Sequence, residues 1–509
     1  MKRFTFILAF CASFALLNAQ DRIMVIADPH VTPQSVIDAE PDFDSYMTKQ
    51  RKMLDLSQPI WDALVDTALA YHPSLILIPG DLTRDGEPEA HAYVSASLHR
   101  LRQAGIHSLV IPGNHDLPNT VDWESLYPVE GESVARDAAS KSYAVTPLRG
   151  LTVIGIDGSN GTAGTGVISP STMRFVLSQA DEAREKGHTV IAMAHWQILE
   201  HFDQQSTLEP ACRFKSADDI RDSLMAHGVH LVLTGHFHVN GITTFRDTTA
   251  LSQDSLVEIT TGAPITFPCP YRWLTLSPDR ASISVTTDYL TSLPSIADLY
   301  SYSRDWMAEH TENLIPSLAL KAWGKVDSMW DSKIVPNLKA LGLDDNLINL
   351  VKKTLPQSNE DRIAITKRNI GTPAINLYLF HSEANEFESP QKGQALAEDV
   401  YAGMQNMVKE ALGLYAIAFG ETFAGMAVLM AQEPVQSLVE DRTLRQSRFS
   451  DLTDDLHLTL SINTPQLPDA LESLNPNPSG ASIKYLHNGQ LFIRRNNGKT
   501  YNAQGIQLK

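Results

Sequence analysis

Short runs of apolar residues recur through the first half of the chain, and polar residues bound each of them. Five such runs lie at residues 23–27, 75–79, 109–112, 190–194 and 231–234. Continuous apolar runs of this length are typical of parallel strands that are buried on both faces. Segments with helical spacing lie between them, at 60–70, 90–103 and 171–186. This alternation predicts a layered α/β fold.

The pattern changes after Ser292-Leu293-Pro294, where strand signals largely stop. Residues 297 to about 461 have helical spacing, so we expect a mainly helical domain over 294–474. Three tryptophans of this region are expected in its core: Trp306, Trp323 and Trp330. We expect this domain to cap the α/β part of the chain, with an independent tether or partner-binding module as the alternative.

Residues 411–431 are unusually apolar. A membrane-spanning helix is one interpretation. Glu421 and several glycines interrupt the stretch, and an ionisable residue is costly in the middle of a bilayer. The sequence therefore favours a buried helix or helix pair and predicts no transmembrane span.

The last part of the chain, residues 475–509, is expected to be a linker followed by a small β module. Asn488-Gly489 and Asn497-Gly498 separate short alternating segments, and Asn-Gly is a strong hairpin signal. The pattern resembles C-terminal modules of secreted Bacteroidota proteins, some of which serve as sorting signals. The resemblance implies the secretion machinery as a partner. The alternative is a terminal hairpin that packs on the helical domain.

The first 19 residues are typical of a signal peptide. Lys2 and Arg3 precede an apolar stretch at 4–17, and Ala19 ends a plausible cleavage site. We therefore expect export to the periplasm, the cell surface or the medium. Cys212 and Cys269 would remain in the mature chain, either paired or as free thiols.

Length and charge narrow the function. A chain of 509 residues is too long for one core and predicts two or more domains. The formal net charge is −18, from 41 basic and 59 acidic residues. Such a surface repels nucleic-acid backbones, so we expect a small substrate and not extended DNA or RNA.

Each of the five apolar runs is followed by side chains that can bind metal ions. The carboxyl ends of parallel strands meet at one edge of a sheet, so these side chains are expected in one crevice. Carboxylate, amide and imidazole ligands without thiolate suit Mn, Fe, Zn or Co. In Asp28-Pro-His30 and His236-Phe-His238 the spacing of two points both side chains the same way on an extended backbone. The candidate ligands are Asp28, His30, Asp81, Asn114, His195, His236 and His238.

The five motifs formed by these runs and the side chains that follow them resemble, in order and in sequence, those of the calcineurin-like metallophosphoesterases over residues 23–287. The resemblance implies a two-sheet sandwich flanked by helices, with the catalytic domain at 20–293. It also implies two divalent transition metal ions. One ion would be held by Asp28, His30, Asp81 and His238, and the other by Asp81, Asn114, His195 and His236.

The same resemblance implies the chemistry. Asp81 would bridge the two ions, which sit about 3.5 to 4 Å apart in such centres. A bridging water would lose a proton near neutral pH and attack phosphorus. His115 would be the general acid, with Asp116 as its orienting partner. Asp85, close by in sequence, is expected to have no part in metal binding or activity.

Only two short sequence motifs indicate the class of substrate. Residues 80–87 and 113–116 look most like the cyclic-nucleotide and glycerophosphodiester phosphodiesterase branch. We therefore expect a phosphodiesterase. The alternatives are a phosphomonoesterase or nucleotide phosphatase, and a protein that binds phosphate ligands through metal without turnover. Arg84 stands where purple acid phosphatases have a metal-binding Tyr, so it is either a phosphate contact or a surface residue. His201 could line the pocket.

Overall fold

The protein is described here by a computed structural model. It describes residues 20–48, 50–116, 121–159, 164–202, 205–246, 255–340, 342–384, 389–413, 416–439 and 456–461, and four short strands between 483 and 508. The predicted signal peptide lies outside the described residues. By contacts between residues the chain forms two units, 1–462 and 463–509.

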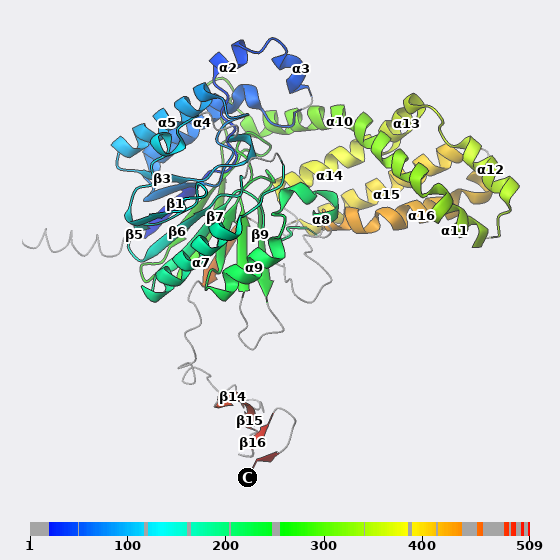
Figure 1. Cartoon of the computed structure of the whole chain (residues 1–509). Helices are drawn as coiled ribbons and strands as arrows, with labels where there is room; N and C mark the ends of the chain where they lie inside the picture. The colour runs from blue at the N-terminus through cyan, green and yellow to red at the C-terminus, as the bar shows by residue number, and fades with distance from the viewer. Residues whose placement is uncertain are drawn as a thin grey trace, which may run out of the picture. The chain divides into compact units, whose positions relative to one another are not determined.

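Two β-sheets form the centre of the first unit (Figure 1). In the first sheet β1, β2 and β3 are parallel, and the remaining strands are antiparallel. Its order is β13-β12-β11-β1-β2-β3. The bounds are β1 Asp21–Val25, β2 Leu75–Ile78, β3 His107–Val110, β11 Pro270–Leu276, β12 Ser282–Tyr289 and β13 His457–Ser461.

The second sheet has the order β4-β5-β6-β7-β8-β10-β9. Its central strands β6, β7, β8 and β10 run parallel to one another. The bounds are β4 Glu132–Arg136, β5 Tyr143–Leu148, β6 Leu151–Ile156, β7 Thr189–Ala194, β8 Leu231–Thr234, β9 Gly241–Arg246 and β10 Ser255–Thr260. The predicted strands at 23–27, 75–79, 109–112, 190–194 and 231–234 correspond to β1, β2, β3, β7 and β8.

The apolar runs are continuous because each strand is covered on both faces. In β1, Ile23 and Val25 point into the core between the two sheets. Met24 and Ile26 point the other way, into a core shared with the helices α4 (Ser57–Tyr71) and α5 (Pro88–Gln103).

The second sheet is built by the same rule. Val153 of β6 faces the inter-sheet core, and Ile154 packs against α7 (Pro170–Glu185) and α9 (Ala217–Ala226). The result is a two-sheet sandwich flanked by helices, as predicted. Short helices complete this part: α2 Gln34–Asp38, α3 Phe43–Met47, α6 Trp123–Leu126 and α8 Gln205–Leu208.

The region after β12 is mainly helical, which confirms the prediction. It comprises α10 Leu299–Met329, α11 Val335–Ala340, α12 Asp345–Thr354, α13 Asn359–Thr366, α14 Thr372–Glu383, α15 Pro390–Leu412 and α16 Ala416–Ser437, with π-helical turns at Trp330–Ile334 and Lys367–Gly371. Trp323 and Trp330 are buried in its cores, whereas Trp306 packs at the edge of the core that α4 shares with the first sheet.

The apolar stretch at 411–431 falls on the end of α15 and on α16, which are antiparallel neighbours in Figure 1. This is the helix pair expected from its glycines and Glu421. Among the described helices, none combines the length and the hydropathy needed to cross a membrane.

One strand lies inside the range predicted as helical. β13 pairs with β12 at the edge of the first sheet, with Leu458 opposite Val285. The helical segment, residues 299–437, is therefore inserted between two neighbouring strands of the sandwich. No sequence signal indicated this pairing, because β13 has only five residues and lies far along the chain from its partner strand.

The second unit contains a four-stranded antiparallel sheet, β14 Ile483–His487, β15 Gln490–Arg494, β16 Thr500–Asn502 and β17 Gln507–Leu508. The pairing of β14 with β15 and of β15 with β16 agrees with the predicted module. The Asn-Gly turns themselves lie outside the described residues.

Candidate metal centre and active site

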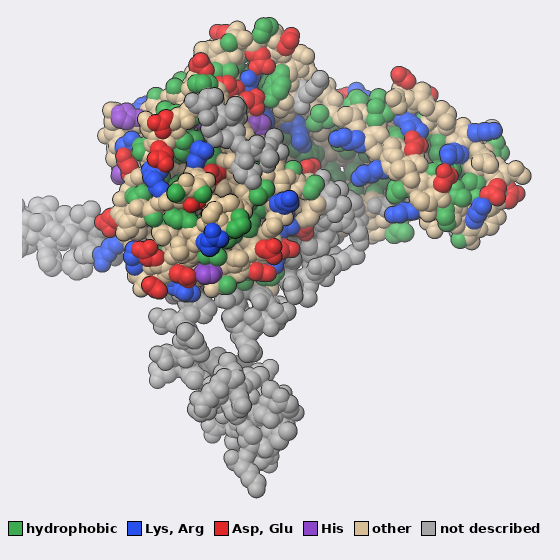
Figure 2. All heavy atoms as spheres, viewed as in Figure 1, with side chains coloured by type: hydrophobic (Ala, Val, Ile, Leu, Met, Phe, Trp, Pro, Cys, Tyr) green, Lys and Arg blue, Asp and Glu red, His purple; other side chains and the backbone are tan. Residues whose placement is uncertain are grey.

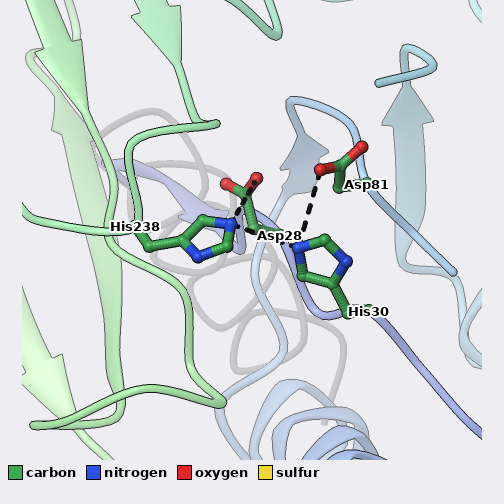
Figure 3. Close-up of side chains that lie close together, drawn as sticks. All are labelled: Asp28, His30, Asp81 and His238. Atoms are coloured by element: carbon green, nitrogen blue, oxygen red, sulfur yellow. Dashed lines mark hydrogen bonds and ion pairs between the residues drawn. The ribbon is translucent and has the colours of Figure 1, made fainter. Parts of the chain in front are cut away.

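Two groups of metal-binding side chains form where β1, β2, β7 and β8 end. The first group consists of Asp28, His30, Asp81 and His238, whose ligand atoms all lie within 4.8 Å of one another (Figure 3). In Figure 3 the imidazoles of His30 and His238 point toward each other, with Asp28 beside His238. The two Nε2 atoms are 3.1 Å apart.

The second group consists of Asp81, His195 and His236. Nε2 of His195 lies 2.9 Å from Nδ1 of His236 and 3.3 Å from Oδ2 of Asp81. Oδ1 of Asn114 is 3.1 Å from the same Nε2 atom. The structure thus brings together all seven residues that the sequence singled out as ligands.

Asp81 belongs to both groups, and its two oxygens differ. Oδ1 accepts a hydrogen bond from the backbone N–H of His115. Oδ2 is buried and has no hydrogen-bond partner among the described residues, and it lies 3.5 Å from His30 Nε2 and 3.3 Å from His195 Nε2. A buried carboxylate oxygen without a partner is costly unless a cation or donor compensates it.

The spacing of these atoms fits metal ions. Nitrogen and oxygen ligands about 2.1 Å from one ion lie roughly 3.0 to 3.4 Å apart for octahedral to tetrahedral angles. The separations of 2.9, 3.1 and 3.3 Å lie in or next to that range. The donor set of carboxylate, amide and imidazole is the one expected for two transition metal ions that share Asp81.

The backbone at the centre is strained and not extended, which corrects one sequence argument. Asp28, His30, Asp81, His236 and His238 all have positive φ, between 41° and 67°. Residues other than glycine rarely adopt this left-handed conformation, which costs on the order of 1–3 kcal/mol each unless packing enforces it. Such strain concentrates at functional sites.

Glycines next to the ligands allow the close approach. A Cβ on Gly113 would lie 2.1 Å from Oδ1 of Asp81, and one on Gly235 would lie 2.3 Å from Oδ2 of Asp28. Both distances are shorter than any non-bonded contact. The glycines of Gly113-Asn114 and Gly235-His236 are therefore required by the position of the neighbouring carboxylates.

Carbonyl groups orient two of the imidazoles. Nδ1 of His195 lies 2.9 Å from the carbonyl oxygen of Pro79, so it donates its proton there and Nε2 faces the second group. Nε2 of His236 lies 3.2 Å from the carbonyl oxygen of Ala211, which leaves Nδ1 to face the group. A carbonyl behind a ligating imidazole fixes its tautomer in metal sites.

The charges at the centre are tightly linked. Burial alone would raise the pKa of Asp81, but the charge of His195, whose Nε2 lies 3.3 Å from Oδ2, holds it well below its usual range. Burial lowers the pKa of His195, yet Asp81 outweighs this effect and raises it to about 9. Burial also keeps the pKa of His30, His236 and His238 low, which favours the neutral imidazole that binds metal.

His115 lies beside the first group, with its ring 4.9 Å from that of His30. Its Nδ1 is 2.6 Å from the carbonyl oxygen of Arg84 and 3.1 Å from Oδ1 of Asp85. Burial lowers the pKa of His115, but the hydrogen bond with Asp85 and the charge of Asp81 give a net increase. Asp85 therefore orients His115, contrary to the expectation that it has no part in the site.

Asp116 has a different role from the one expected. Its carboxylate accepts hydrogen bonds from the backbone N–H groups of Thr83 and Gly113 and from the Thr83 hydroxyl. It thereby joins the loop after β2 to the loop after β3. Burial, with the nearby charge of Asp81, raises the pKa of Asp116 to about 7. Asp116 thus supports the loop that carries His115, while Nδ1 of the His115 ring meets Arg84 and Asp85.

Arg84 is buried and is therefore not a surface residue. It is 8% exposed, and its guanidinium pairs with Glu40 and with Glu87, the latter at 2.9 Å. Arg84 also lies over the rings of Phe43 and Tyr46. Its side chain thus ties the loop after β2 to α3, and only its carbonyl reaches the site, through His115.

His201 is part of a buried polar network. Its Nδ1 is 3.2 Å from the Thr243 hydroxyl, and its Nε2 is 3.0 Å from Thr260 and 3.3 Å from Glu258. Glu258 is fully buried and accepts the backbone N–H groups of Ile198 and Leu199. This network fixes the loop that follows His195, a role that no sequence signal indicated because its members are spread over three strands and a loop.

The two cysteines of the expected mature chain are both free. Cys269 is buried and Cys212 is partly exposed.

These features define a two-sheet α/β domain with a dinuclear metal-binding centre at its strand ends. Residues 21–240 match the family model of the calcineurin-like phosphoesterases. A comparison with proteins of curated function gives no significant match.

Solved structures that part of this chain is similar to include a dimetal phosphatase from Danio rerio and phosphopantetheinyl hydrolase from Mycobacterium tuberculosis. The first is 13% identical, with a TM-score of 0.36, and the match covers 52% of this chain and 95% of that protein. The second is 11% identical, with a TM-score of 0.23, and the match covers 48% and 91%. Such low scores carry no argument about the substrate of this chain.

Proposed function

We propose that the protein is a metal-dependent phosphoric ester hydrolase with a dinuclear centre. The observation that carries this proposal is the position of Asp81, whose unpartnered Oδ2 lies between His30 and His195 and so between the two ligand groups. One group would be Asp28, His30, Asp81 and His238, and the other Asp81, Asn114, His195 and His236. Two divalent ions held there would supply the Lewis acidity that activates water and neutralises a phosphate.

His115 is the proton donor in this proposal. Arg84 and Asp85 engage its Nδ1, so Nε2 is the nitrogen left to protonate the leaving oxygen. The His115 side chain is 29% exposed, and its contact with His30 keeps the ring at the edge of the centre. A histidine in this position favours turnover over simple capture of phosphate, because binding alone needs no acid.

The test compares wild type with Asp81→Asn after removal of metal and reconstitution with Mn²⁺, Zn²⁺ or Co²⁺. Wild type should bind two equivalents and hydrolyse aryl phosphate esters, and Asp81→Asn should lose most of both. Asp66→Asn is the matched control, since Asp66 is an exposed residue of α4 that pairs with Arg100 of α5. Two bound ions with no turnover on any ester would support the alternative of a non-catalytic phosphate-binding protein.

We also propose a phosphodiester as the substrate class, with a phosphomonoester or nucleotide as the alternative. The proposal rests on the likeness of residues 80–87 and 113–116 to the phosphodiesterase branch. The net charge of −18, and the mixture of acidic and basic side chains on the face shown in Figure 2, favour a small substrate over a nucleic acid. A panel of aryl diesters, aryl monoesters, cyclic nucleotides and glycerophosphodiesters, compared by kcat/KM, tests this choice.

Export is a further part of the proposal and rests on the sequence of residues 1–19. Expression in a Gram-negative host, followed by fractionation and mass measurement, should give a periplasmic or released protein that begins at Gln20. A full-length protein in the cytoplasm would contradict it. Deletion of residues 475–509 would then show whether the terminal β module affects delivery to the surface.

A further inference from the structure

Helix α14 reaches the loop that carries two of the metal-binding histidines. His381, near the end of α14, packs its ring edge-on against Phe237, with the ring centroids 5.9 Å apart. Phe237 lies between His236 and His238 in the sequence. His381 makes a second edge-on contact with Phe202, at 5.8 Å, and Phe202 stacks on Phe237 at 5.6 Å. The three rings form a closed triangle, here called the aromatic triad.

More apolar contacts join the same loop to the helical segment. Val239, which follows His238, is buried in one core with Ala384, the residue that ends α14. Leu456, just before β13, is buried in this core, and Phe237 packs against it. The C-terminal end of α14 and the residue that precedes β13 therefore meet at the residues that flank His238.

A second contact supports the other side of His238. The carbonyl oxygen of His238 accepts hydrogen bonds from the backbone N–H of Ala263 and the hydroxyl of Thr266. Phe267, next along that loop, packs in one core with Met307 of α10 and Leu379 of α14. The loop after β10 is thus held between His238 and the helical segment.

The histidine loop needs such support because its backbone is strained. His236 and His238 have φ of 67° and 64°, so left-handed residues stand on both sides of Phe237. Left-handed residues other than glycine persist only where their surroundings enforce the conformation. The side chain of Phe237 can hold this loop in place through packing contacts. In the aromatic triad it packs against Phe202 and His381.

We propose that His381 is a positioning residue for the metal centre, which acts through Phe237 to hold His236 and His238 in binding geometry. The inference rests on the proposed metal centre. By this inference the helical segment supports metal binding by the sandwich domain, in addition to any effect that it has on substrate selection. Residues that support metal ligands from behind typically change metal affinity by about 10- to 100-fold.

The experiment measures Mn²⁺ binding to the metal-free full-length protein by calorimetry. Three variants are compared with wild type: His381→Ala, His381→Phe and His310→Ala. His381→Phe keeps an aromatic ring in the triad. His310 is the control because it too is a histidine of the helical segment that packs on an aromatic ring: it is buried and stacks on Trp306 at 4.0 Å.

His381→Ala should weaken Mn²⁺ binding by about tenfold. His381→Phe should restore most of the affinity, and His310→Ala should leave it unchanged even if it lowers the Tm. The inference is overturned if His381→Ala binds Mn²⁺ as wild type does, or if it loses affinity only as much as His310→Ala. Failure of wild type to bind Mn²⁺ would instead remove the proposed metal centre.

If His381→Ala does not fold, the contact is tested from the other side of the triad. Phe202→Leu keeps apolar volume but removes both of the ring contacts that Phe202 makes. It should weaken Mn²⁺ binding in the same direction as His381→Ala, and unchanged affinity in a folded Phe202→Leu protein would overturn the inference.

Discussion

Asp85 lies 3.1 Å from Nδ1 of His115, and this contact, together with the carbonyl of Arg84, sets the direction in which the His115 ring points. The two residues come from different loops, one after β2 and the other after β3. A carboxylate behind an imidazole stabilises its protonated form and fixes its orientation.

Asp85→Asn should therefore reduce turnover without removing metal. We expect a loss of about 10-fold or more in kcat on esters with poor leaving groups, because general acid catalysis depends on the position and charge of the donor. Metal content should remain at the wild-type level, since Asp85 is in neither ligand group. Asp66→Asn serves again as control. Wild-type kcat in Asp85→Asn would show that the carbonyl of Arg84 orients the ring without help.

His115→Ala tests the acid itself. Turnover should fall by about 10² to 10⁴ for an alkyl leaving group. The loss should be much smaller for a nitrophenolate, which leaves without a proton. The measurement is kcat for two diesters that differ only in the leaving group. Equal losses on both would mean that His115 binds substrate and is not the proton donor.

Gly113→Ala should disrupt the metal centre more than its size suggests. The added Cβ would lie 2.1 Å from Oδ1 and 2.6 Å from the backbone N of Asp81, so the shared carboxylate must move. We expect loss of most bound metal by elemental analysis. Gly324→Ala in α10 meets no atom within 4 Å and is the control. It should keep both ions and gain up to about 1 kcal/mol of helix stability. A fully loaded Gly113→Ala protein would contradict the geometry of the loops.

His91, which is not one of the proposed metal ligands, should make the stability of the protein depend on pH. Burial lowers the pKa of His91 to about 4, from 6.5. The unfolded chain therefore binds this proton more readily, and the free energy of unfolding should fall as the pH drops from about 6.5 to 4.

His91→Gln should remove this part of the acid sensitivity. The measurement is urea unfolding at several pH values between 4 and 7, and the slope against pH should be shallower in the variant. The residue is buried and its Nδ1 meets the hydroxyl of Tyr127 at 2.8 Å, so some overall stability will also be lost. His99→Gln, on the exposed side of the same helix, should match wild type. Parallel profiles for His91→Gln and wild type would refute the assignment.

The strands and ligands were predictable because they follow from local patterns. Each of β1, β2, β3, β7 and β8 is a continuous apolar run, and polar ligands come directly after it in the loop. The flanking helices likewise have clear apolar stripes. The order of the blocks then indicated that Asp81 is shared, and the structure places it between the two groups.

What could not be predicted depends on contacts between distant parts of the chain. Asp116 stands next to His115 in sequence, yet the short turn at Asn114–Asp116 directs its carboxylate back to Thr83. Arg84 could not be distinguished from a phosphate contact without knowing that Glu40 and Glu87 lie around it. The contact of His201 with Glu258 could not be predicted, because the two residues are more than fifty positions apart in the sequence.

The pairing of β13 with β12 has a consequence for how the protein assembles. The hydroxyl groups of Ser284 in β12 and Thr459 in β13 are hydrogen-bonded although the two residues are 175 positions apart in the sequence. The edge strand β13 can therefore join the sheet only after the whole helical insertion has been synthesised. During synthesis, β12 remains an open edge that invites pairing with other chains. A protein cut at residue 293 would keep that edge open permanently and would be prone to aggregate. Separating the two parts therefore calls for an internal deletion, with a short linker that returns the chain to Leu456 so that β13 can still close the sheet.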